Sequence, residues 1–274
     1  MFLNSVILVL QEILEAALLI SVMLVLTHEL RRHWRDCFQL RTIWVLYSVA
    51  WGVAGAIVYA WLMPTVSVWF DYSGLEVINA CMQFFIIFFL LGFCYVLNPK
   101  VFETQASLRS TIASVCMVCV VALGITREGS EIILYGAGIM GQPENISPVV
   151  LGGLMATGIG ISSGWFLFYG LVSLKHSAAF RTAFVLLALF AGNMAAQGVL
   201  LLTQADWLPY TVELWDSSSL LPEYTVPGQL LYALIGYEAT PSLLQGGAYL
   251  LAALLVLSSP LFMLALTPSR AQSS

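Results

Sequence analysis

Two short stretches combine acidic side chains at helical spacing with strongly apolar surroundings. Glu12 and Glu15 lie in the first apolar segment, while Glu128 and Glu131 lie in a later one, directly after Arg127. Spacing i, i+3 places both carboxylates of a pair on one face of a helix, about one turn apart. Charged side chains at membrane depth are expensive and mark functional positions. If the two pairs converge, four carboxylates and one guanidinium give the site a formal charge of −3.

Such a cluster has the chemistry of a cation site. Carboxylate oxygens are the ligands that hard metals prefer, and a trivalent ion would balance the charge. Two other interpretations stay open: hydrogen bonding between partly protonated acids, and a path for protons or substrate without metal. An intramembrane metal-dependent oxidase is a further alternative. Helix-bundle sites of that kind use Glu-x-x-His, and the three histidines lie at or beyond the ends of the apolar segments, beside the basic loops.

The composition predicts that these stretches lie in transmembrane helices. Of the 274 residues, 60 % are hydrophobic and 9 % are charged, which excludes an ordinary soluble domain. Only helices satisfy every backbone polar group within one segment of about 20 apolar residues. Because Glu12 and Glu15 interrupt the first run, we expect that run to be a retained helix, not a cleaved signal peptide. The seven expected spans are 3–28, 42–63, 74–97, 110–139, 147–174, 180–203 and 243–267. We therefore predict an all-α polytopic membrane protein with one transmembrane domain over 1–274.

The loop charges predict the orientation. Nine of the ten basic residues follow the odd-numbered spans, namely Arg31, Arg32, Arg35, Arg41, Lys100, Arg109, Lys175, Arg181 and Arg270. The opposite loops carry only acids, five of them from Asp206 to Glu238. The positive-inside rule then places the N-terminus outside and the C-terminus in the cytoplasm. In the acidic outer loop, the apolar piece Gln229–Ile235 is too short to span, and we expect it in the interface or as a re-entrant turn.

The polar residues of the spans indicate an internal repeat. The matching pairs are Glu12 and Glu128, and Glu15 and Glu131, offset by 116, with Asn79 and Asn193, and Gln83 and Gln197, offset by 114. Three spans per unit is an odd number, so the second unit is inverted, as in many transporters. The predicted parts are repeat one (about 1–105), repeat two (about 106–204), the outer loop with its short helix (about 205–242) and the seventh helix (about 243–267).

Other polar and small residues have two interpretations each. Glu76, at the outer end of the third span, is either a relay toward the central site or an interfacial carboxylate. The amide pairs Asn79 with Gln83 and Asn193 with Gln197 either line the path or join helices by hydrogen bonds. Small residues recur at spacing four, at Gly152, Ala156, Gly160 and Gly164, and predict close approach of another helix.

The motif Arg127-Glu128-Gly129-Ser130-Glu131, with Glu12-Ile13-Leu14-Glu15, resembles the R-E-x-x-E motifs of the high-affinity iron permeases in the iron/lead transporter family. Glu76, Ala191-Gly192 and Gly236-Tyr237 are weaker matches. The resemblance implies a multi-pass protein of the cell (plasma or inner) membrane that imports iron, as Fe3+ in the best-known members. Iron would be the transported substrate, not a cofactor, and no enzymatic activity is expected.

The resemblance also implies an extracytoplasmic partner that oxidises or delivers iron, and no nucleic acid. A carrier for another hard or borderline cation, such as Pb2+ or Mn2+, remains the alternative. One position departs from the family pattern: Gln11 stands where the family has arginine. We therefore expect the first carboxylate pair to be more negative, or more readily protonated, than in typical members.

Overall fold

The protein is described by a computed structural model that covers residues 2–33, 43–96, 106–139, 143–222, 225–260 and 262. In these ranges the named elements are all α-helices, which confirms the predicted class. They are α1 (Phe2–His33), α2 (Ile43–Val66), α3 (Gly74–Val96), α4 (Ala106–Ile139), α5 (Pro143–Val172), α6 (His176–Gln204), α7 (Val226–Ile235) and α8 (Leu243–Leu257). Among the charges used to predict orientation, Arg35, Arg41, Lys100, Glu223 and Arg270 lie outside the described residues.

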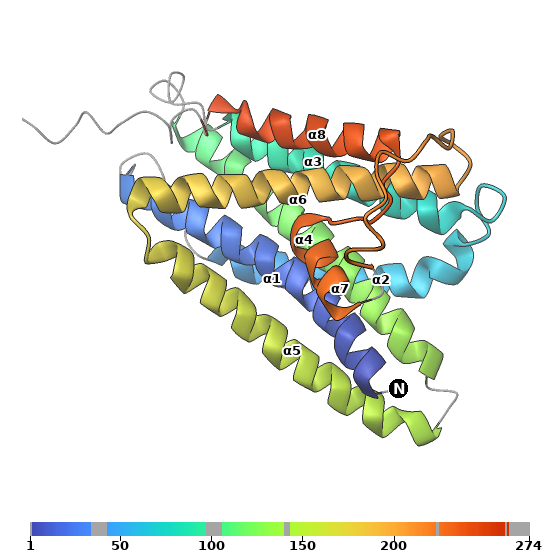
Figure 1. Cartoon of the computed structure of the whole chain (residues 1–274). Helices are drawn as coiled ribbons and strands as arrows, with labels where there is room; N and C mark the ends of the chain where they lie inside the picture. The colour runs from blue at the N-terminus through green and yellow to red at the C-terminus, as the bar shows by residue number, and fades with distance from the viewer. Residues whose placement is uncertain are drawn as a thin grey trace, which may run out of the picture.

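Six helices, α1 to α6, are long and apolar enough to cross a membrane. They coincide with the first six predicted spans to within a few residues. The short helix α7 covers the piece Gln229–Ile235 and has defined ends: the Thr225 side chain accepts from the Gly228 backbone, and Gly236 closes the C-terminus in the left-handed region at φ 69°. It lies against α1 and α6 (Figure 1).

The seventh predicted span needs correction. Helix α8 begins at Leu243 and ends at Leu257, whereas the prediction ran to 267, of which residues 261 and 263–267 lie outside the described part of the chain. Its 15 residues extend about 22 Å at 1.5 Å per residue, less than the roughly 30 Å of a bilayer core. The physical reason is Pro260, which disfavours helical geometry at the residue before it. Helical conformation resumes at residue 260, and the Phe262 backbone donates to the Ser259 hydroxyl.

Close approach of two helix pairs fixes the bundle. The predicted small-residue ridge of α5 faces α1: a Cβ added at Gly160 would lie 2.3 Å from Ile13, and one at Gly164 2.9 Å from Ala17. Without a hydrophobic driving force between helices in lipid, such backbone contact supplies much of the association. The predicted close approach of another helix to this ridge is therefore confirmed: the ridge packs against α1, and the two helices run side by side in Figure 1.

Helix α2 supports α4 in the same way. A Cβ at Gly52 would lie 2.6 Å from Ile125, and one at Gly55 2.3 Å from the Thr126 hydroxyl. That hydroxyl also donates to the Gly52 carbonyl at 3.3 Å. Each helix that carries an E-x-x-E pair is thus held against a glycine-bearing neighbour, which restricts where its carboxylates can lie.

The apolar core lies between α1, α3, α4 and α6, and α6 is the most deeply buried span. The largest fully buried side chains of this core include Met23, Leu90, Phe93, Met117 and Phe184. Helices α1 and α4 contact each other within this bundle. This contact brings the polar residues of the two helices toward one another.

Candidate metal centre

Three glutamates from two helices converge on one point. Glu12 of α1 and Glu128 and Glu131 of α4 each offer a carboxylate oxygen, and these oxygens lie within 4.8 Å of one another. Glu12 and Glu128 are 7 % and 4 % exposed, whereas the side chain of Glu131 is 39 % exposed. Oxygens on opposite sides of a hard cation are roughly 4–5 Å apart. The arrangement therefore has the dimensions of a single-ion site with one accessible side.

Arg127 lies buried beside this group. Its Nη1 is 2.5 Å from Glu128 Oε1 and 3.5 Å from Glu15 Oε2, and its Nη2 is 3.9 Å from Glu131 Oε1. One guanidinium thus faces three of the four carboxylates. Buried charges are tolerated when paired, and here the acids outnumber the base. A bound cation would supply the missing positive charge.

Glu15 is also buried, at 3 % exposure, and lies beside both Arg127 and Glu128. Gln11, one turn earlier, is half-buried. The sequence led us to expect that the first pair lacks a neighbouring positive charge because Gln11 replaces arginine. In the structure Arg127 reaches across from α4, so one guanidinium serves both pairs.

At this centre, two buried carboxylate oxygens have no hydrogen-bond donor within the described part of the chain: Glu15 Oε2, whose neighbour is Arg127, and Glu128 Oε2. Because Arg127 takes Oε1 of Glu128, Oε2 is the oxygen left for another ligand. An unsatisfied buried carboxylate oxygen is costly in a folded protein. Its presence inside a carboxylate group fits a site completed by a cation.

The buried amides form a separate chain. Gln83 Nε2 donates to Gln197 Oε1 at 2.9 Å, and Gln197 Nε2 donates to Asn193 Oδ1 at 3.0 Å. This joins α3 to α6, and the Asn193 side chain packs against Gly236 after α7. The Gln83–Gln197 bond is interhelical, as one of the two interpretations expected, whereas the Gln197–Asn193 bond lies within α6.

The remaining predicted residues lie on the α2–α3 side. The Tyr59 hydroxyl donates to Asn79 Oδ1 at 3.0 Å. Tyr59 is also within electrostatic range of both Glu131 and Glu76, and Glu76 Oε2 is buried without a hydrogen-bond partner among the described residues. Sequence reasoning missed Tyr59, because an aromatic residue in an apolar span carries no distinguishing signal.

A contact at the Phe2–Tyr135 end of the α1–α4 interface was also missed. The hydroxyls of Ser5 and Tyr135 lie 2.7 Å apart and join the two helices. Tyr135 follows Glu131 by four residues and so lies on the same helix face. The spacing could have revealed it, but a lone tyrosine near a helix end is common at membrane interfaces.

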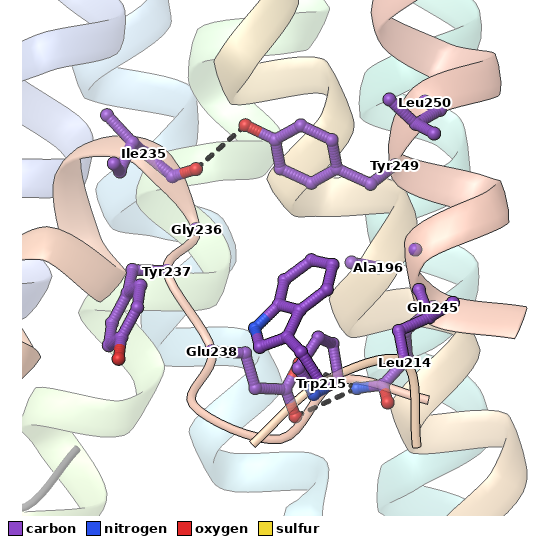
Figure 2. A pocket seen from close by; sticks show the side chains of 12 residues that line it. Ala196, Leu214, Trp215, Ile235, Gly236, Tyr237, Glu238, Gln245, Tyr249 and Leu250 are labelled. Carbon is purple, nitrogen blue, oxygen red and sulfur yellow. Dashed lines mark hydrogen bonds between the residues drawn. The ribbon is translucent and has the colours of Figure 1, made fainter. Parts of the chain in front are cut away.

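A cavity of about 280 Å³ lies apart from this centre, between α6, α8 and the loops before and after α7. Trp215 and Tyr249 form its walls, and the Glu238 carboxylate accepts from Gln245 Nε2 at 2.8 Å (Figure 2). No residue of the carboxylate group lines it. In the loop before α7, hydrogen bonds from Ser218 lower the pKa of the exposed Asp216 carboxyl, which keeps that acid ionised.

The fold and this centre define a class: a multi-pass helical protein of the cell membrane with a cluster of buried glutamates. Comparison with known proteins is consistent with that class. The chain is 24 % identical over 148 residues to proteins named ferrous iron permease EfeU from Shigella flexneri serotype 5b and from Escherichia coli O157:H7. These matches cover 53 % of this chain, with 63 % and 53 % of the respective relatives.

A further relative of that name, from Escherichia coli O6:K15:H31, is 24 % identical over 127 residues. The chain spans less than two thirds of the length of the curated relatives it matches. No protein-family model matches the sequence, and no solved structure matches the fold. The matched relatives are permeases, not enzymes, and confirm the resemblance to iron permeases that the E-x-x-E motifs indicate.

Proposed function

We propose that this protein is an iron permease that imports iron across the cell membrane through the carboxylates of its two E-x-x-E helices. The observation that carries this proposal is the convergence of Glu12, Glu128 and Glu131 on one point. The names of the relatives add iron as the ion. The site would take hard cations, because its ligands are carboxylate oxygens.

The proposed path of the ion runs from the acidic side of the membrane protein to its basic side. Iron arrives from the acidic outer loop, reaches the centre at the exposed side of Glu131 and leaves toward the basic cytoplasmic loops. Movement of two inverted repeats against each other would open the site to either side in turn. The helix pairing supports this plan: exchanging α1 with α4 and α2 with α5 turns the α1–α5 contact into the α4–α2 contact.

Two observations favour different oxidation states of the transported iron. The formal charge of −3 from four glutamates and Arg127 favours a trivalent ion, whereas the relatives are named for ferrous iron. We propose Fe3+ on the basis of the formal charge, and the test includes both Fe3+ and Fe2+. An extracytoplasmic protein that oxidises or delivers iron would fit either case.

The test is iron flux in proteoliposomes containing the purified protein. Radioactive iron is supplied as Fe2+ under anaerobic conditions or as an Fe3+ chelate, with the pH set separately on each side. Glu12→Gln and Glu128→Gln should each abolish uptake, while Glu213→Gln, an exposed acid of the outer loop, should leave it near the wild-type rate. Uptake that survives both cluster substitutions at equal protein level refutes the proposal.

Competition in the same assay decides the alternative cargo. Excess Mn2+ or Pb2+ that suppresses iron uptake and is itself accumulated would identify a broader carrier. The oxidase alternative has a separate signature, namely turnover of Fe2+ without flux. Within the described residues, the group that could hold a metal contains glutamates alone, which favours transport over that chemistry.

A further inference from the structure

Helix α7 presents its polar side chains to the carboxylate centre. Its sequence is apolar except for Gln229 and Tyr232, and the spacing i, i+3 places these two on one face. Tyr232 lies within electrostatic range of Glu15 and Glu128. Gln229 Oε1 is buried without a hydrogen-bond donor in the described part of the chain. The short helix therefore covers part of the centre instead of lying apart from it in the outer loop.

The position of α7 explains an asymmetry between two equivalent acids. Glu15 is 3 % exposed, whereas the side chain of Glu131, its counterpart 116 positions later, is 39 % exposed. Helix α7 packs against α1, which carries Glu15, and against α6 (Figure 1). The centre thus has an accessible side at Glu131 and a side at Glu15 that α7 closes.

The C-terminal end of α7 is anchored. Within the described residues, α7 receives a hydrogen bond from another helix at this end, where the Tyr249 hydroxyl of α8 donates to the Ile235 carbonyl at 2.8 Å (Figure 2). Gly236 follows at φ 69°, and a Cβ added there would lie 2.6 Å from Asn193 Oδ1 of α6. Hinges are a few element-terminal residues that absorb large changes in φ and ψ. Gly236 has the place and the backbone freedom of such a hinge.

The cavity of about 280 Å³ lies beside this anchored end. Ile235, Gly236 and Tyr249 are among the residues that line it (Figure 2). Protein interiors are close-packed, so a space of this size next to a helix end leaves room for that end to move. Tyr232 is also within electrostatic range of Glu238, which lines the cavity. About one turn of α7, from Tyr232 to Ile235, therefore separates the carboxylate centre from the cavity.

We propose that α7 is a gate that closes the Glu15 side of the carboxylate centre and turns about Gly236 into the adjacent cavity to let the ion pass. This inference rests on the proposed function, and it concerns the movement that opens the site, not the ligands. In the closed position Tyr232 covers the carboxylates. When α7 turns, Tyr232 leaves them, and the ion gains a way past Glu15 in addition to the side of Glu131.

The test fills the cavity so that α7 cannot enter it. Ile235→Cys places a thiol on the cavity wall, whereas Leu234→Cys places one on the neighbouring residue, which is not among those that line the cavity; both positions are 38 % exposed. Each full-length variant, in a cysteine-free background, is labelled to completion with N-phenylmaleimide in detergent and then reconstituted. Iron flux into proteoliposomes and equilibrium binding of radioactive iron are measured relative to the same variant before labelling.

The label on Ile235→Cys should reduce iron flux at least about tenfold, because it holds α7 in the closed position, and should leave iron affinity within about threefold, because the ligands are untouched. The label on Leu234→Cys should change flux and affinity by less than about threefold. Should Ile235→Cys fail to fold, Ala196→Leu takes its place, because it fills the same cavity from α6 without a label. Flux should again fall while binding persists.

Flux that survives in the cavity-filled protein overturns the gate, and so does an equal loss of flux with the labels on Ile235→Cys and Leu234→Cys. Iron binding that is lost together with flux overturns it as well, because the added group then acts on the centre itself. In all three cases the wild type still carries iron, and the proposed function stands. A wild type that carries no iron overturns the proposed function instead.

Discussion

Gln83 and Gln197 lie 114 positions apart in the sequence and share a buried 2.9 Å hydrogen bond between α3 and α6. In an inverted repeat, equivalent residues meet each other only near the pseudo-two-fold axis. Glu12 and Glu128, the first acids of their motifs, also meet, within the converging group. Two such self-pairs support the proposed repeat, whose pseudo-two-fold axis would pass through both the amide contact and the carboxylate centre.

The amide contact predicts a stability effect. Gln83→Leu leaves Gln197 Oε1 buried without its donor, which costs about 1–3 kcal/mol of the free energy of unfolding. Thr157→Val is the control, because the half-buried Thr157 hydroxyl donates to the Gly153 carbonyl of its own helix and joins no other helix within the described part of the chain. The control should change stability by less than about 0.5 kcal/mol. Equilibrium unfolding in mixed micelles measures both, and equal effects would contradict the assignment.

The seat of α1 on α5 predicts opposite outcomes for two neighbouring glycines. Gly160→Ala introduces a Cβ 2.3 Å from Ile13 and should destabilise the bundle by about 1–3 kcal/mol. Gly158 is exposed, and a Cβ there meets nothing within 4 Å. Gly158→Ala should therefore be neutral, or stabilising by up to about 1 kcal/mol through helix propensity. A Gly160→Ala protein as stable as Gly158→Ala would refute the close packing.

The contrast between these two glycines also indicates what the sequence could reveal. Spacing four predicted the buried ridge that includes Gly160, and apolar length predicted six spans and the short α7. The limit of α8 was missed because residues 258–267 are as apolar as a span, and only Pro260 marks the interruption. The sharing of Arg127 was also missed. Which carboxylate a guanidinium reaches depends on the crossing of α1 and α4, and that geometry has no signal in either segment alone.

Gln11 offers a test of the charge of the site. Gln11→Arg places a second guanidinium at i, i+4 from Glu15, where it can pair with that carboxylate and compete with Arg127. The formal charge of the centre then changes from −3 to −2. A unit charge about 10 Å away at an effective dielectric constant of about 20 costs about 1.7 kcal/mol for each unit of charge on the cation, so affinity should fall roughly 300-fold for Fe2+ and several thousand-fold for Fe3+.

Binding of both iron species to Gln11→Arg, measured beside Gln11→Met, checks this expectation. The methionine variant has a similar length and no charge, so it should behave as the wild type does. If the arginine variant binds both ions with wild-type affinity, Gln11 is a neutral departure from the family motif.

Two contacts near the ends of the helices show which ends lie on the same side of the bundle. Phe70 and Trp207 pack edge to face at 5.4 Å, which brings the α2–α3 and α6–α7 connections to one end. His176 pairs with the buried Glu29, which brings the other ends of α1 and α6 together. The positive-inside rule assigns the first end to the outside and the second to the cytoplasm.

Single cysteines in a cysteine-free background test that assignment. Tyr210→Cys and Val68→Cys are exposed positions at the first end, and Leu174→Cys is an exposed position at the second. A membrane-impermeant maleimide added to intact spheroplasts should label the first two and reach Leu174→Cys only after permeabilisation. The opposite pattern would invert the protein, make iron approach Glu131 from the cytoplasm and turn the proposed importer into an exporter.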